Sequence, residues 1–293
     1  MKNRSMIYTI MRWAGTVAFV VWCSCSTGTQ LAGGSGSGNP GSATASIVVG
    51  IDTVSAGLAK TVAQSVPLSP NAGGQGPRGL VKVADLSGTV FNIDSVFLLT
   101  QRITFIPDTD RLCDSLMARI SGPLMCGDFG PSLEGDEYFE AVSRTALPAI
   151  GRFFIPAVAY RGIVLHFGQH TPAQSGVPAH SAIEIRGTFS YMDTMRAITI
   201  TCSTNVAITC RTSDSVFTVN RNDTLSLAVL FTSRAWFANV DIGGAIARGE
   251  LHFESDGSLT ISDRSTPVPG AGSSIAAKIR SNIMSAGRLQ VGR

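Results

Sequence analysis

Four side chains of the kinds that bind transition metals stand close together in the sequence: His166, His170, His180 and Glu184. Imidazole nitrogen and carboxylate oxygen suit zinc or copper, and a site needs three or four such donors to converge. His166 and Glu184 share the outward parity of two expected strands, so they are predicted to meet across a sheet face. His170 and His180 belong to the Gly- and Pro-rich loop between those strands. The competing interpretation is that the three histidines and Glu184 are surface side chains that bind no metal.

A second group, Asp108, Asp110, Asp114 and Asp128, has the chemistry of a calcium loop, because calcium takes carboxylate and carbonyl oxygens. The regular acidic spacing of an EF-hand, with its central Gly and closing Glu, is absent. The other interpretation is a set of solvated turn residues, with Asp110 capping a short helix over residues 110–120.

Six cysteines divide into two near the N-terminus and four further on. An even number of cysteines in an exported chain indicates disulfides, and nearest neighbours predict Cys113–Cys126 and Cys202–Cys210. Two other connectivities are open, as are reduced, buried thiols. None of these cysteines has C-x-x-C spacing, which argues against redox catalysis and a zinc ribbon.

Catalytic signatures are missing from the sequence after residue 46: no G-x-S-x-G, S-x-x-K or H-E-x-x-H occurs. The G-x-G-x-x-G match at Gly74–Gly79 precedes a strand-like segment, whereas a dinucleotide site requires a helix there. The densest acidic group has the character of a surface loop: Glu134, Asp136, Glu137 and Glu140. The sequence therefore predicts a protein that is not an enzyme and needs no cofactor.

The elements that would position these residues follow an export signal. Lys2, Arg4 and Arg12 precede the uncharged apolar run Trp13–Trp22, which is too short to span about 30 Å of hydrocarbon as a helix. The run stops at Cys23-Ser24-Cys25, and a small residue before Cys25 makes it the predicted lipidation site. Residues 1–24 are thus expected to form a lipoprotein signal peptide; cleavage without a lipid and an uncleaved anchor are the alternatives.

Residues 25–46 are rich in Gly, Ser, Thr and Ala, which predicts a flexible linker. The net charge of +3 equals the charge of the signal, so the rest of the chain is close to neutral and nucleic acid is not an expected partner. Residues 47–293 are expected to form one domain at the cell envelope, attached to the outer membrane or cell surface by its lipid.

Period-two alternation dominates that domain. The odd positions of Phe91–Phe105 predict one apolar face along a bent or broken strand, and Ile183–Tyr191, Leu225–Phe231 and Leu251–Phe253 alternate likewise. The segment Ile198–Cys210 is expected to be a hairpin turning near residues 203–205. These patterns predict a mainly β, antiparallel β-sandwich of transthyretin or immunoglobulin type. A C-terminal helix is expected over residues 273–286.

One segment resembles a known family. Ile155–Leu165 reads I-P-A-V-A-Y-R-G-I-V-L and is similar to the I-P-A-G-x-Y-x-x-I-x-L strand of bacterial surface lipoproteins that have a transthyretin-like β-sandwich domain of unknown function. Val158 replaces the usual Gly. Further similar segments occur in the same order: Ile93–Phe105, Ile183–Phe189, Trp236–Ile242 and Ile275–Ile283. The resemblance implies a non-catalytic domain at the cell surface and assigns no catalytic residue.

Together these features predict an envelope-anchored lipoprotein that acts as a structural or binding module, with a membrane contact through its lipid and a surface protein or glycan as partner. The alternative is a surface receptor or accessory protein for a metal or a carbohydrate, for which Trp236 is the only tryptophan outside the signal. Clustered exposed aromatic side chains would favour the carbohydrate version.

Overall fold

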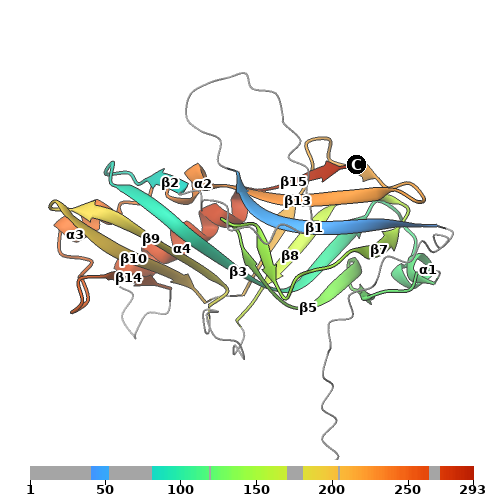
Figure 1. Cartoon of the computed structure of the whole chain (residues 1–293), viewed down its shortest axis with the longest axis horizontal. Helices are drawn as coiled ribbons and strands as arrows, with labels where there is room; N and C mark the ends of the chain where they lie inside the picture. Colours follow the sequence, from blue (N-terminus) through green and yellow to red (C-terminus); the bar gives the residue numbers. More distant parts are fainter. Residues whose placement is uncertain (1–40, 53–80, 119, 170–180, 204, 264–270) are drawn as a thin grey trace, which may run out of the picture. The chain divides into compact units, whose positions relative to one another are not determined.

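The computed structural model describes residues 41–52, 81–118, 120–169, 181–203, 205–263 and 271–293 (Figure 1). Of these, 53% are in strands and 13% in helices, which confirms the mainly β prediction. Strand β1 (Ser42–Asp52) begins inside the predicted linker, so the linker boundary at residue 46 is wrong. Small residues such as Ala43 and Ala45 pack into the core from this strand, although their composition resembles that of a linker. Residues 1–24 and Cys25 lie outside the described residues.

Strand β3 (Val90–Pro107) is the axis of the larger sheet. One of its edges pairs with β2 (Val81–Ala84) and then with β5 (Gly130–Glu140). The other edge pairs with β9 (Ile183–Tyr191) and then with β8 (Ala159–Phe167), which therefore follow one another along β3. Smaller strands extend the β5 side and the β8 side: β4 (Leu124–Gly127), β6 (Thr145–Leu147) and β12 (Phe217–Thr218).

The expected hairpin over Ile198–Cys210 is wrong. Strand β10 (Thr194–Cys202) pairs with β9, whereas β11 (Val206–Cys210) pairs with β8, so β10 and β11 run in the same direction and do not pair with each other. Cys202 and Cys210 are eight positions apart along the chain, about 25 Å at the rise of an extended strand. A disulfide requires Cα atoms within about 7 Å. Both cysteines are accordingly free and buried, and the Cys202–Cys210 pairing is wrong.

The smaller sheet has the order β15-β13-β1-β7. Strand β13 (Thr224–Thr232) runs parallel to β1, and β15 (Gly287–Gly292) runs antiparallel to β13. In the larger sheet, β14 (Leu259–Ser262) is parallel to β10. The sheets are therefore mixed, and the prediction of purely antiparallel sheets is wrong at these two pairs. Strand β7 (Phe153–Pro156) pairs with β1 only at residues 42–45.

Register irregularities divide β3 between Ile93 and Ser95 and between Thr100 and Arg102, and a third lies near its end, between Ile106 and Pro107. An extra residue in a strand moves the following side chains to the opposite face. The buried side chains change parity accordingly: Phe91 and Ile93, then Val96 and Leu98, then Ile103 and Phe105. The single odd-numbered apolar face predicted from the sequence is therefore wrong between the first two irregularities, where Phe97 and Leu99 lie on the outer face.

Helix α4 (Ala271–Ser285) confirms the expected C-terminal helix within two residues at each end. It packs on β10 and β14 through its buried Ala276, Ile279 and Ile283. The other three helices of the described residues are short: α1 (Cys113–Met117), α2 (Ser233–Trp236) and α3 (Ile242–Ala247). Within the part of the chain that the structure describes, no helix has both the length and the apolar character needed to cross a membrane.

One hydrophobic core joins both sheets and α4. Aromatic rings link its parts: Phe105 of β3 lies 5.8 Å from Phe153 of β7, and Phe91 lies 5.2 Å from Phe237, measured between ring centroids. Trp236 and Phe237 are both 1% exposed. They therefore belong to this core and offer no surface on which a sugar would stack.

Candidate functional site

The two predicted metal ligands that the structure describes, His166 and Glu184, lie apart. His166 stands opposite Arg102 on β3, whereas Glu184 stands opposite Phe97, so successive strands β8 and β9 carry them to different points along β3. His166 lies 3.3 Å from the hydroxyl of Thr104, and burial, then the charge of Arg102, lowers its pKa. His170 and His180 lie outside the described residues. Among the described residues, no three His, Cys, Asp or Glu side chains are grouped to hold a metal ion.

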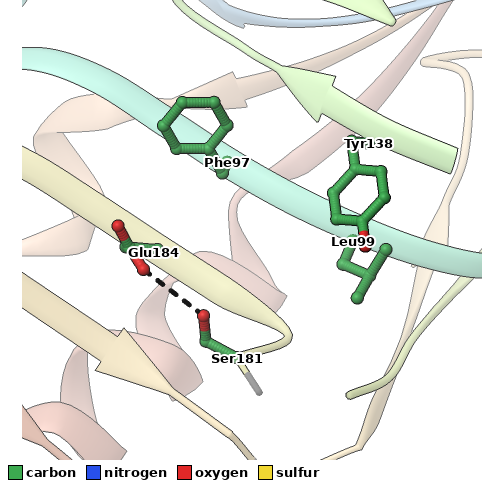
Figure 2. Close-up of a pocket in the computed structure, with 5 residues that line it drawn as sticks. All are labelled: Phe97, Leu99, Tyr138, Ser181 and Glu184. Atoms are coloured by element: carbon green, nitrogen blue, oxygen red, sulfur yellow. Dashed lines mark hydrogen bonds between the residues drawn. The ribbon is translucent and has the colours of Figure 1, made fainter. Parts of the chain in front are cut away.

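Glu184 instead belongs to a small depression on the outer face of the larger sheet (Figure 2). Phe97, Leu99, Tyr138 and Ser181 line it with Glu184, and the space does not admit a water molecule. The Glu184 carboxylate forms an ion pair with Arg186, whose guanidinium carbon lies 5.4 Å from the centre of the Phe97 ring. Figure 2 shows Ser181 directed at the same carboxylate, at 3.5 Å. The depression therefore holds the Glu184–Arg186 ion pair and has no room for a ligand.

The predicted calcium ligands are also dispersed. The Oδ1 atom of Asp108 accepts a hydrogen bond from Nε of Arg161 at 2.6 Å, and Asp110 is exposed. Asp114 and Asp128 line a shallow space of about 380 Å³ beside Arg111, whose positive charge opposes cation binding. Cys113 and Cys126 also line this space and form the predicted disulfide, with their Cα atoms 5.6 Å apart. The disulfide prediction is confirmed, and the four aspartates form no common site.

A different feature has the dimensions of a ligand site: a cleft of about 470 Å³ beside β1. Ligand pockets typically measure about 300–1,000 Å³ and combine apolar walls with a few polar groups. Here β1 supplies one wall through residues 46–49, and the segment 143–152 supplies the other. Phe139 and Val49, both almost fully buried, and Ile150 give the cleft its apolar surface.

The cleft exists because β7 accompanies β1 for only four residues. Their pairing ends at Ala45 and Phe153, and the chain between β6 and β7 lines the opposite side of the cleft. The far end is closed where the N–H of Ile51 donates to the carbonyl of Ala141 at 3.2 Å. Between these points, at residues 46–50, no strand of the described residues pairs with this edge of β1.

Two arginines border the cleft. Arg144 is exposed and adopts a left-handed backbone conformation, with φ of 58°. Its guanidinium donates to the carbonyl of Ile51 at 3.3 Å, and its side chain lies over Gly50, where an added Cβ would come within 2.9 Å of Cγ. Arg152 is exposed as well. Within the described part of the chain, neither arginine forms an ion pair.

The acidic residue of the adjoining turn does not neutralise these charges. The Glu140 carboxylate accepts hydrogen bonds from the backbone N–H groups of Val96, Val142 and Ser143, at 2.6–3.1 Å. Ser143 and Thr145 add exposed hydroxyl groups at the mouth of the cleft. Two available guanidinium groups over an apolar floor suit an anionic ligand that also carries apolar groups.

None of the residues of this cleft was among the sequence-predicted sites. A signal was present, however, because the segment from Ala141 to Phe154 contains Arg144 and Arg152 and no acidic residue. No family model, curated protein or solved structure matches the chain. The geometry of the cleft is therefore the basis on which a function is proposed.

Proposed function

We propose that the protein is a non-catalytic binding module anchored at the bacterial cell envelope, and that the cleft beside β1 holds its ligand, an anion with apolar groups. The observation that carries the proposal is the pair Arg144 and Arg152. Both stand at an apolar cleft without an ion-pair partner in the described residues. Arginine is the usual side chain for binding carboxylate and phosphate, because its planar fork donates two parallel hydrogen bonds.

The envelope address is supported by the signal-like N-terminus, by Cys25 and by the Cys113–Cys126 disulfide. Disulfides persist in oxidising compartments outside the cytoplasm. As part of the same proposal, the two sheets form a β-sandwich related to the transthyretin-like domains of surface lipoproteins. Their shared core, with Phe105 packed near Phe153, supports that arrangement.

The address is tested by the intact mass of the protein from the membrane fraction of a bacterial host. Processing at Cys25 with a lipid attached predicts a chain that starts at Cys25 and carries the added mass of acyl groups. A Cys25→Ser variant is expected to lose the lipid and leave the membrane fraction, whereas Cys23→Ser is the matched control and stays there. An unprocessed wild-type chain would refute the lipid anchor.

The ligand site is tested with three anionic probes: dodecanoate, an oligosaccharide of glucuronic acid, and an acidic peptide. At least one probe is expected to bind the wild-type protein, and to bind an Arg144→Asn, Arg152→Gln variant about tenfold more weakly or worse. A Lys82→Gln, Arg234→Gln variant removes two exposed basic side chains on β2 and α2 and is expected to bind like wild type. Equal binding by all three proteins, or no binding of any probe, would refute the cleft as the ligand site.

A further inference from the structure

Within the described ranges of the chain, no strand pairs with the edge of β1 that lies inside the cleft. Neighbouring residues of a strand direct their N–H and C=O groups to opposite edges. Ile51 directs its N–H to Ala141 and its C=O to Arg144, so Ile47 and Val49 face the same edge. That edge has a strand partner in β7 only at residues 42–45. The backbone groups of Ile47 and Val49 are thus presented to the cleft.

An open strand edge is a template for another strand, because each backbone group needs a hydrogen-bond partner when it is covered. Recognition of an extended peptide by addition to a sheet edge uses this property, and pockets for alternate side chains supply specificity. The open stretch, residues 46–50, would pair with a peptide of four to five residues, about 15 Å long. A fatty acid or a sugar lacks the repeating donor and acceptor groups that match Ile47 and Val49.

The two faces of β1 determine which side chains such a peptide would carry. On the inner face, the cleft is floored by Phe139 and bordered by Ile150, so an inward side chain meets apolar surface. On the outer face, Arg144 lies over Gly50, so an outward side chain meets a guanidinium group. Side chains of a strand alternate between the faces. The ligand pattern is therefore acidic and apolar residues in alternation.

We propose that the β1 edge between residues 46 and 50 binds an extended peptide segment, in which acidic side chains that meet Arg144 and Arg152 alternate with apolar side chains that enter the cleft. This inference rests on the proposed function and specifies its ligand. The backbone of the peptide continues the line of β7 along β1, and the arginines select its charge.

The test uses the full mature protein and fluorescein-labelled peptides of eight residues, in which Glu alternates with Val, Leu or Thr. Fluorescence anisotropy is expected to show binding of at least one Glu peptide and no binding of the corresponding Lys peptide. N-methylation of alternate backbone nitrogens, placed on the edge that faces β1, removes donors without changing charge. It is expected to weaken binding at least tenfold, whereas methylation of the other nitrogens has little effect.

Variants complete the test. Arg144→Asn and Arg152→Gln are each expected to weaken peptide binding about tenfold, and Lys82→Gln, Arg234→Gln leaves it unchanged. Circular dichroism confirms that each variant is folded.

Equal affinity for both N-methylated forms would overturn strand addition. Arginine-dependent binding of dodecanoate or the glucuronic acid oligosaccharide without peptide binding would overturn this inference and leave the proposed function standing. If neither arginine substitution changed the binding of any probe, both this inference and the proposed function would be overturned.

Discussion

Arg144 occupies a backbone conformation that glycine adopts readily and that costs a residue with a Cβ about 1–2 kcal/mol. Its φ of 58° places it in the left-handed region, in the turn between β5 and β6. The hydrogen bond to the carbonyl of Ile51 compensates part of this cost. A strained arginine beside a cleft is consistent with a residue retained for binding.

We therefore predict that Arg144→Gly separates stability from binding. The free energy of unfolding is expected to stay within about 1 kcal/mol of wild type, because relief of backbone strain offsets the lost hydrogen bond. Affinity for the acidic peptide is expected to fall about tenfold or more. Denaturant unfolding and anisotropy measure the two quantities. Asn239→Gly, which relieves a φ of 56° away from the cleft, is the control. A large loss of stability with unchanged affinity would make Arg144 a structural residue.

The buried carboxyl group of Glu137 is expected to make the stability of the fold depend on pH. Burial, then the nearby charge of Asp136, raises its pKa from 4.5 to about 6, and its Oε2 atom is buried without a hydrogen bond in the described structure. The folded state thus holds this proton more tightly than the unfolded state. The stabilising contribution is complete below pH 4.5 and is lost as the pH rises through about 6.

Glu137→Gln is accordingly expected to unfold at a higher temperature than wild type at pH 8, and the difference is expected to shrink toward pH 4.5. Thermal unfolding at several pH values measures this effect. Glu254→Gln removes an exposed carboxylate and serves as the matched control. A difference that is constant with pH, or one of opposite sign, would contradict the assignment.

Cys202 and Cys210 are predicted to be unreactive in the folded protein. Burial raises the pKa of each thiol to about 12, so only about one molecule in ten thousand carries the thiolate at pH 8. A thiol reagent is expected to modify neither cysteine in the native state and both after denaturation. Peptide mapping distinguishes them from Cys25. Rapid native labelling at either position would show that the thiol is accessible.

At the scale of elements, alternation predicted most strand positions but neither the parity changes within β3 nor the partners of the strands. Ser95 and Gln101 interrupt the odd apolar series near the irregularities, and the alternation alone does not say that the face changes there. Residues 203–205 have the composition of a turn, yet β10 and β11 on either side of them run in the same direction. The cleft depends on where β7 leaves β1, a tertiary feature that no local pattern contains.

The Cys113–Cys126 disulfide joins α1 to β4, and we predict that it stabilises this end of the molecule. The two cysteines are 13 positions apart, and closing a loop of that length stabilises a protein by about 3 kcal/mol in the chain-entropy description. Cys113→Ser, Cys126→Ser is expected to lower the free energy of unfolding by about that amount. A reductant should destabilise the wild type and leave the double variant unchanged. Equal denaturation midpoints with and without reductant in the wild type would refute the prediction.

At the scale of the whole molecule, one wall of the cleft and its floor are parts of the sheets. Residues 46–49 belong to β1 of the smaller sheet, and Phe139 belongs to β5 in the larger one. A preformed site of this kind loses little conformational entropy when a ligand binds. We therefore expect the site to be formed before the ligand arrives.

Reversal of the cleft charge tests whether Arg144 and Arg152 select an acidic peptide. Anisotropy titrations compare a Glu–Val peptide and a Lys–Val peptide on three proteins. These are the wild type, a cleft variant that carries both Arg144→Glu and Arg152→Glu, and a control variant that carries both Lys82→Glu and Arg234→Glu. Wild type and control are expected to bind the Glu peptide, and the cleft variant is expected to lose it and to gain the Lys peptide. Binding of the Glu peptide by the folded cleft variant at wild-type affinity would show that the two arginines do not select the ligand.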